Sequence, residues 1–279
     1  MDFDVPGPRT FREWLAAHWI SEMRGTRYGA ANRGQPLRVV LDQVIAAVDD
    51  TTPLLAAGGV SHGAQIADLA AAGACGVLIT IDMQRDFLSD SPYGLAGTTE
   101  VIPALRRLAG AFREKGRPVV HVVRLYEPGG GNADRVRRTL LVGGAAIVAP
   151  GSPGSQLAPG LAPDGASDLD PSHLLAGKVQ RLGPDEYVVF KPRWGAFYQT
   201  PLQSLLSDLD VDTLVVAGCN LPNCPRATVI EASERDYRVV LVSDAVSMRS
   251  EQGLREIAGI GVQLLTTDQV TEALTGQGG

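Results

Sequence analysis

The chain has 279 residues, of which 44% are hydrophobic, and it carries a formal net charge of −6. Such a chain is long enough for one large globular domain, or for one domain with an appendage. The acidic balance argues against a nucleic-acid surface, and no run is apolar enough to predict a transmembrane helix. Three cysteines do not make a disulfide framework, and the N-terminus lacks the features of a signal peptide. We therefore expect a cytoplasmic protein.

The first 74 residues predict a helical extension. A capping-box sequence at Thr10–Glu13 marks the start of a predicted helix, and Phe11, Trp14 and Trp19 lie on its apolar face. A second broad apolar stripe follows at 37–48. Because two or three short helices cannot bury these surfaces among themselves, we expect residues 9–50 to contribute to the interface of a homo-oligomer, with a dimer favoured. The alternative is an arm that folds back on its own subunit.

From residue 75 to residue 279, short apolar segments alternate with amphipathic ones, which is the pattern of a parallel sheet with helices on both faces. Buried strands are predicted at 76–81, 118–125, 186–190, 213–217, 238–242 and 262–265. Residues 127–171 are rich in Gly, Pro and Ala and predict a long loop with short helices, which in a compact domain is usually functional. The prediction is an α/β fold with a doubly wound, mostly parallel six-stranded sheet.

Polar residues follow three of these strands, at the edge where ligands bind in open parallel sheets. Asp82 follows the first strand, Lys191 follows the third, and Cys224 comes after a turn at the start of a helix. Asn223 is suited to cap this helix, and Ala227, Ile230 and Tyr237 share one of its predicted faces.

Helix N–H groups and the helix dipole stabilise a thiolate, so we predict a depressed pKa and a nucleophilic role for Cys224. The alternative interpretation of each residue is structural: Cys224 as a small buried side chain, Asp82 as a turn cap and Lys191 as an edge residue that reaches solvent.

Three segments resemble the isochorismatase-like cysteine hydrolases: ITIDMQRDF at 79–87, FKPRWGAF at 190–197 and VVAGCNLPNCPRATVIEASERDYRVVLVSDA at 215–245. The resemblance covers roughly residues 75–265 and implies the fold of that family, a six-stranded parallel sheet between helices. It maps a catalytic triad onto Asp82, Lys191 and Cys224. It also implies a cis peptide bond at Cys219–Asn220, which turns the Asn220 N–H towards the site, beside the Cys224 N–H, as an oxyanion hole.

The reaction implied by this resemblance is hydrolysis of a small amide, ureide or carbamoyl C–N bond through a thioester acyl-enzyme. In it, Asp82 takes the thiol proton, Lys191 holds the carboxylate, and Cys224 attacks the carbonyl carbon. The predicted substrate-binding residues lie in these segments, near the end of the second predicted strand or in the long loop: Phe87, Trp194, Phe197, Arg124 and Asn132. Their alternative roles are as ordinary core aromatics and solvated loop residues.

The chain departs from its relatives near the predicted site. No histidine follows the second strand, where nicotinamidases carry an Asp-x-His metal site, and the four histidines show no ligand spacing. We therefore predict no metal and no cofactor, and we doubt nicotinamide as the substrate. Leu221-Pro222 replaces the Thr followed by Asp or Asn of many relatives.

Two other functions stay open: an isochorismatase-type vinyl-ether hydrolase, which needs no cysteine, and a non-catalytic binding protein on this fold. The presence of Cys224 argues against the vinyl-ether reaction.

Overall fold

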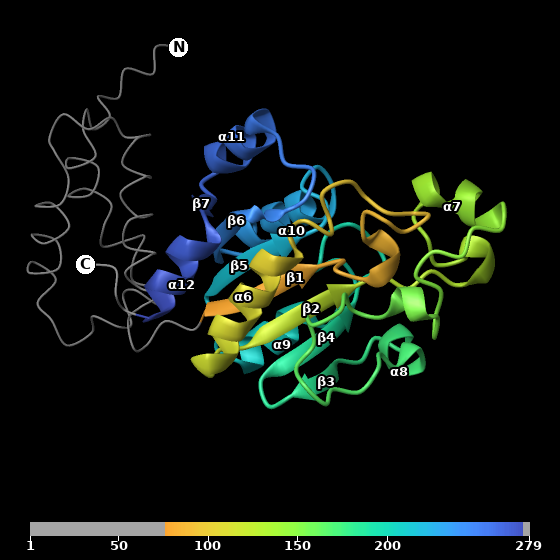
Figure 1. The fold of residues 1–279 in the computed structure, drawn as a ribbon, viewed down its shortest axis with the longest axis horizontal. Helices are drawn as coiled ribbons and strands as arrows, with labels where there is room; N and C mark the ends of the chain where they lie inside the picture. Colours follow the sequence, from red (N-terminus) through yellow and green to blue (C-terminus); the bar gives the residue numbers. More distant parts are fainter. Residues whose placement is uncertain (1–75, 276–279) are drawn as a thin grey trace, which may run out of the picture. The chain divides into compact units, whose positions relative to one another are not determined.

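The computed structural model describes residues 76–275, which form a seven-stranded sheet with helices on both faces (Figure 1). The strand order is β3-β4-β2-β1-β5-β6-β7, and every neighbouring pair is parallel except β3 and β4. The predicted α/β class and mostly parallel, doubly wound sheet are confirmed, but the prediction of six strands is wrong by one. The predicted helical extension 1–74 lies outside the described residues.

The strands are β1 (Gly76–Ile81), β2 (Val119–Val123), β3 (Gln180–Gly183), β4 (Glu186–Phe190), β5 (Thr213–Gly218), β6 (Arg238–Val246) and β7 (Gln263–Leu265). The α-helices are α6 (Ile102–Glu114), α7 (Arg135–Val142), α8 (Pro171–Leu175), α9 (Leu202–Asp208), α10 (Cys224–Ser233), α11 (Glu251–Gly259) and α12 (Thr267–Thr275). Short 3-10 helices also form in the loops: η1 (Arg85–Phe87), η2 (Pro128–Gly130) and η3 (Pro153–Ser155). In this part of the chain, no helix is long and apolar enough to cross a membrane.

The strand that the sequence analysis missed is β3, which pairs antiparallel with β4 at one edge of the sheet. Its sequence is QRLG, and only Gln180 in it is buried. An edge strand has a single partner strand and needs little apolar surface. The continuous apolar run that identifies central strands such as β1 and β5 is therefore absent from β3.

Alternate residues of the central strands face opposite layers of helices. Val77, Ile79 and Ile81 of β1 belong to a core cluster that also contains buried residues of α9, α10 and α11. On the other face, α6 and α12 contact each other and cover β1, β2 and β6 (Figure 1). Both faces of β1 are thus dry, which explains why all six of its residues are buried. A strand fixed in this way holds the residue that follows it, Asp82, in a defined position.

Helix α10 differs from the prediction in its buried face. Ile230 is 40% exposed, and Tyr237 lies beyond the end of the helix. The residues that face the core are mostly small or β-branched: Cys224, Pro225, Thr228, Val229 and Ala232. Small side chains allow α10 to pack closely on β5 and β6. The spacing of its larger residues therefore did not predict which face of the helix is buried. Asn223 occupies the N-cap position, but its side chain makes no capping hydrogen bond.

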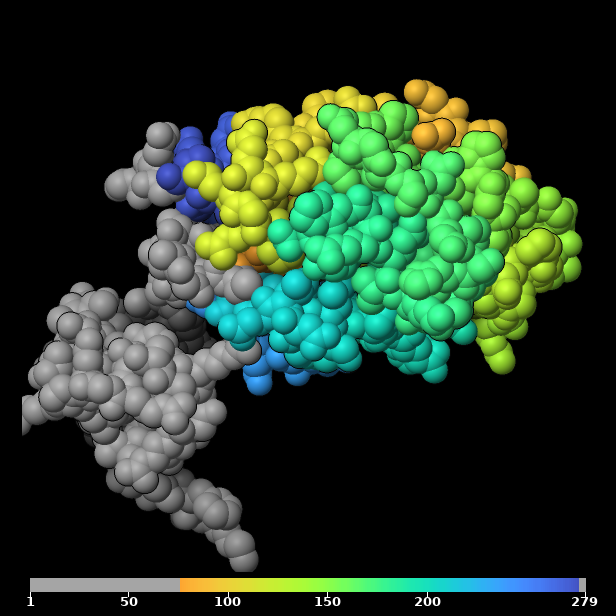
Figure 2. Space-filling model, turned by 90° about the horizontal axis from the view of Figure 1, so that it is seen from below, coloured from red at the N-terminus to blue at the C-terminus, as the bar shows by residue number. Residues whose placement is uncertain are grey.

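Residues 127–171, called the excursion below, contain η2, α7 and η3 and are otherwise irregular, as predicted. The excursion is tied to the segment after β1, because the Gln84 side-chain amide donates to the Ser155 carbonyl oxygen over 2.7 Å. The carboxylate of Asp86 also accepts from the Val148 N–H over 2.6 Å. Figure 2 shows the excursion, in yellow-green and green, as a continuous stretch of the surface. It reaches the carboxyl ends of the strands, where the candidate site lies.

Candidate active site

Asp82 stands at the centre of the site, directly after β1. Its side chain is buried, and its backbone N–H donates to the Val122 carbonyl oxygen over 2.8 Å. Its φ angle of 52° lies in the left-handed region, which Asp tolerates better than most residues. The carboxylate oxygen Oδ2 accepts a hydrogen bond from Lys191. The other oxygen, Oδ1, is buried and has no hydrogen-bond partner among the described residues, so it can still accept a proton or a hydrogen bond.

Lys191 directly follows β4 and is completely buried, which excludes a role as an edge residue that reaches solvent. Its backbone N–H donates to the Val123 carbonyl oxygen, which continues the pairing of β4 with β2. The ammonium nitrogen Nζ donates to Asp82 Oδ2 over 2.8 Å and to the Arg193 carbonyl oxygen over 3.3 Å. Since a buried ammonium is costly without a partner, Lys191 and Asp82 depend on each other.

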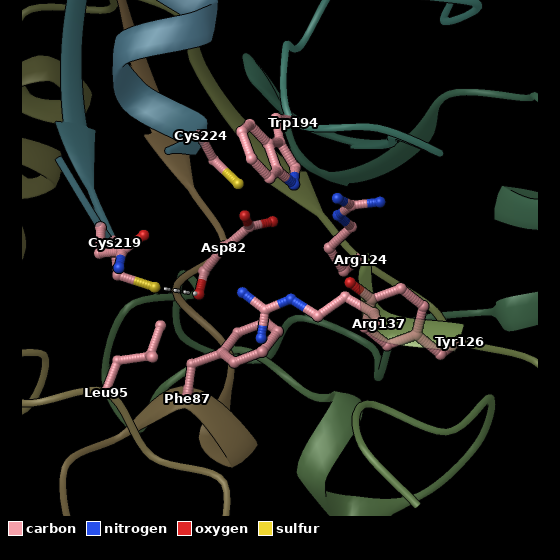
Figure 3. Close-up of a pocket in the computed structure, with 10 residues that line it drawn as sticks. Asp82, Phe87, Leu95, Arg124, Tyr126, Arg137, Trp194, Cys219 and Cys224 are labelled. Atoms are coloured by element: carbon pink, nitrogen blue, oxygen red, sulfur yellow. Dashed lines mark hydrogen bonds between the residues drawn. The ribbon is translucent and has the colours of Figure 1, made fainter. Parts of the chain in front are cut away.

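Cys224 is the first residue of α10, and its thiol is buried beside Asp82. Figure 3 shows its sulfur pointing towards the Asp82 carboxylate. Burial and, after it, the negative charge of Asp82 raise the pKa of the Cys224 thiol to about 11, although the positive charges of Lys191 and Arg124 oppose the shift. The prediction of a depressed pKa is therefore wrong, because burial outweighs the favourable helix terminus. The resting thiol is protonated at neutral pH and needs a base before it can attack.

The turn between β5 and α10 brings two backbone N–H groups to the site. Gly218 has a φ angle of 123°, and a Cβ atom there would lie 2.3 Å from the Ile81 carbonyl oxygen, so only glycine fits. The peptide bond from Cys219 to Asn220 is cis. Among residues 76–275, neither the Asn220 N–H nor the Cys224 N–H donates a hydrogen bond. Both groups are thus available to an acceptor bound beside Cys224.

These residues open onto a cavity with an empty volume of about 330 Å³, counting the part that is open to solvent. It is lined by Asp82, Phe87, Leu95, Arg124, Tyr126, Arg137, Trp194, Cys219, Asn220 and Cys224 (Figure 3). Of the predicted substrate-binding residues, the structure brings Phe87, Arg124 and Trp194 to the cavity together with Asp82 and Cys224.

Two predicted substrate-binding residues do not line the cavity. Phe197 is 5% exposed, belongs to the core, and stacks on Tyr237 with the ring centres 5.8 Å apart. The side chain of Asn132 instead holds its own loop. Its Oδ1 accepts from the Glu127 N–H over 3.0 Å, and its Nδ2 donates to the Leu125 carbonyl oxygen over 2.8 Å.

The cavity also contains residues that the sequence analysis did not select: Leu95, Tyr126, Arg137 and Cys219. Tyr126 and Arg137 belong to irregular or weakly periodic sequence, where no pattern indicates which side chains turn inwards. Cys219 lies in the turn that resembles the family motif, and its Sγ contacts the Asp82 carbonyl oxygen at 3.5 Å (Figure 3). The free cysteine next to a strand end was the one signal that pointed to this position.

Arg124 forms a buried charged group with two neighbours. Its Nη2 donates to Asp134 Oδ2 over 2.9 Å, and its guanidinium lies 5.4 Å from the centre of the Tyr126 ring. Burial lowers the pKa of Arg124, but Tyr126, Asp82, Cys224 and Asp134 together raise it more, so the cation persists. Burial also raises the pKa of Tyr126, which keeps its hydroxyl neutral. Arg124 thus presents a fixed positive charge near Asp82 and Cys224.

The described residues contain no group of three or more His, Cys, Asp or Glu side chains placed to hold a metal ion. The carboxylate at the cavity, that of Asp82, is paired with Lys191 instead.

The sequence matches the family model of the isochorismatase domain over residues 76–169 and 168–269. The chain belongs to the isochorismatase family. An isochorismatase family protein from Desulfovibrio vulgaris has a solved structure that is 30% identical, with a TM-score of 0.62, and the match covers 73% of this chain and 100% of that one. The family membership that the three sequence segments suggested is therefore confirmed.

Two curated relatives extend the comparison within the isochorismatase family. A ureidoacrylate amidohydrolase from Methylobacterium radiotolerans is 28% identical over 215 residues, which cover 72% of this chain and 78% of that protein. A protein from Arabidopsis thaliana described as a probable inactive nicotinamidase is 29% identical over 207 residues, which cover 71% of this chain and 95% of that protein. Since the relatives include a protein considered inactive, the chemistry of this chain has to be argued from its own residues.

Proposed function

We propose that this isochorismatase-family protein is a cysteine hydrolase that cleaves the C–N bond of a small amide, ureide or carbamoyl compound through a thioester acyl-enzyme. The observation that carries the proposal is the buried group of Asp82, Lys191 and Cys224, in which one carboxylate oxygen has no hydrogen-bond partner among the described residues. Similarity to an amidohydrolase supports the class of bond. A reaction at this cavity needs a nucleophile, a base and an oxyanion site, and each has a candidate here.

In the first half of the reaction, Asp82 accepts the thiol proton while the Cys224 sulfur attacks the carbonyl carbon. A C–S bond forms, and the carbonyl electron pair moves onto oxygen, where the N–H groups of Asn220 and Cys224 stabilise the negative charge. Asp82 then gives the proton to the leaving nitrogen. The C–N bond breaks, ammonia or an amine leaves, and the acyl group remains on sulfur as a thioester.

In the second half, water attacks the thioester as Asp82 removes its proton. The C–S bond breaks, the carboxylic or carbamic acid leaves, and the proton returns to the Cys224 sulfur. Lys191 holds the Asp82 side chain in place through its hydrogen bond of 2.8 Å to Oδ2. Because the thiol pKa is about 11, the thiol is protonated at neutral pH and must lose its proton as the sulfur attacks.

The proposal is tested with a panel of small amides, ureides and carbamoyl compounds, scored by ammonia release from the wild-type protein and from Cys224→Ala. We expect the substitution to lower turnover by about 1,000-fold or more, since the nucleophile is lost. The fold should survive, because one buried sulfur contributes little to packing, and circular dichroism checks this. Retention of most of the wild-type rate by Cys224→Ala would contradict the proposal, because C–N bond cleavage would then not need the cysteine nucleophile.

A further inference from the structure

Two arginines line the catalytic cavity, and they differ in how their charges are balanced. Arg124 donates to Asp134 and is held against Tyr126, so its charge has a fixed partner. Arg137 lies one turn into α7 and is half-buried. Among the described residues, its guanidinium makes no hydrogen bond or ion pair. Arg137 thus presents a half-buried guanidinium at the cavity whose N–H groups are still able to donate hydrogen bonds.

The helix that carries Arg137 is anchored at both ends. Asp134 is the N-cap residue of α7, and its Oδ2 binds Arg124 and also accepts from the Tyr126 hydroxyl at 3.4 Å. At the other end, Leu141 is buried against Gly130, where an added Cβ would lie 3.1 Å from the Leu141 Cβ. Arg137 follows Asp134 by three residues and lines the same cavity as Arg124, the partner of Asp134. Figure 3 shows the Arg137 side chain reaching inwards among the lining residues.

Among the described residues, the ionised groups at the cavity include one positive charge without a counter-charge. Asp82 is balanced by Lys191, and Arg124 is balanced by Asp134. The remaining charge is that of Arg137, and three apolar side chains line the same cavity: Phe87, Leu95 and Trp194. Apolar walls exclude water and strengthen the attraction of a cation for an anion. The planar fork of a guanidinium matches the two oxygens of a carboxylate, which it binds through two parallel hydrogen bonds.

We infer that Arg137 binds a carboxylate of the substrate, so that the substrates are small amides or ureides that carry a carboxylate as well as the scissile C–N bond. The inference rests on the proposed function, because it places the amide at Cys224 while the carboxylate lies at Arg137. Arg137 is then the residue that selects anionic substrates over neutral ones. Arg124 keeps a separate role, in which it holds the start of α7 through Asp134.

A matched pair of amides tests the inference: succinamate, which carries a carboxylate, and succinamide, which has a neutral amide in its place. Ammonia release is measured with the full-length wild type, with Arg137→Gln and with Arg135→Gln. Arg135 is an exposed arginine on the same helix that does not line this cavity. Arg137→Gln should lower kcat/KM for succinamate by about 10- to 100-fold and leave that for succinamide within about threefold. Arg135→Gln should change neither, and Arg137→Lys should restore part of the loss.

Binding is measured separately, so that a failure of the chemistry does not hide the result. In the Cys224→Ser background, calorimetry should show that succinamate binds at least about tenfold more tightly than succinamide, and that Arg137→Gln removes this preference. Equal affinity for the two compounds, no binding of succinamate, or a preference that survives Arg137→Gln overturns the inference. A preference that depends on Arg137, found together with full turnover by Cys224→Ala, overturns the proposed function alone.

Discussion

At the level of single residues, the protonation state of Cys224 determines how the site has to work. Burial, together with the negative charge of the adjacent Asp82 carboxylate, raises the pKa of this thiol to about 11. In the proposed mechanism, the Asp82 oxygen that has no hydrogen-bond partner among the described residues accepts the thiol proton when a substrate arrives, and the resting thiol stays unreactive.

This protonation state predicts the pH dependence of alkylation. Since only the thiolate reacts, the rate at which iodoacetamide labels Cys224 should rise about tenfold per pH unit between about pH 7 and about pH 9.5, without a plateau. The rate is measured by peptide mass spectrometry. The variant Asp82→Asn removes the negative charge that raises the pKa, so its rate should be higher at each of these pH values. A plateau at or below about pH 8 in the wild type would show that the thiol pKa is not raised.

The residues of the site differ in how well the sequence predicts them. Asp82, Lys191 and Cys224 stand at strand ends or a helix start, where the pattern of apolar runs specifies their place, and the structure brings them together. Phe197 lies beside a motif, yet its side chain turns into the core. Arg137 lies in the excursion and turns into the cavity. Which way a loop residue points depends on long-range contacts, such as that of Asp134 with Arg124, which the local sequence does not contain.

At the level of elements, the close approach of β5 and β1 sets the position of the turn that carries Cys219 and Asn220. The Cys219 N–H donates to the Ile81 carbonyl oxygen over 2.9 Å, and Gly218 packs directly on the same backbone. The turn can therefore form only if residue 218 has no side chain. The positions of the Asn220 and Cys224 N–H groups depend on this turn.

Two glycine substitutions test this condition. Gly218→Ala places a Cβ 2.3 Å from the Ile81 oxygen and 2.6 Å from the Ile81 nitrogen, so it should lower the free energy of unfolding by at least about 2 kcal/mol and greatly reduce ammonia release. Gly110→Ala in α6 is the control. It meets no atom within 4 Å and should raise the free energy of unfolding by about 0.5–1 kcal/mol. Urea unfolding measures both, and equal stability of the two variants would contradict the explanation.

Elements with a clear periodicity were predictable, and those that depend on their neighbours were not. The predicted bounds of β1 and β4 agree with the structure, because both are short apolar runs bounded by polar residues. The edge strand β3 has no such run and is defined by its pairing with β4. Helix α10 buries small residues, so its inward face is decided by close packing on the sheet and not by side-chain size.

At the level of the whole molecule, the parallel sheet assembles a site from distant parts of the chain. Asp82 and Lys191 are 109 positions apart in the sequence, yet β1 and β4 both flank β2 and end at the same edge. The order of the strands brings β5, and with it the turn before Cys224, to the other side of β1. Residues 9–50 lie outside the described residues, so the dimer interface expected there stays a prediction.

The central claim is that Cys224 carries the acyl group during turnover. The compound of the panel that releases ammonia fastest is mixed with the protein, the reaction is quenched in acid, and the protein is analysed by mass spectrometry. We predict an added mass equal to the compound minus ammonia, located on the peptide that contains Cys224, and a hydroxamate product when hydroxylamine is present. Steady ammonia release with neither adduct nor hydroxamate, or an adduct on another residue, would contradict the account.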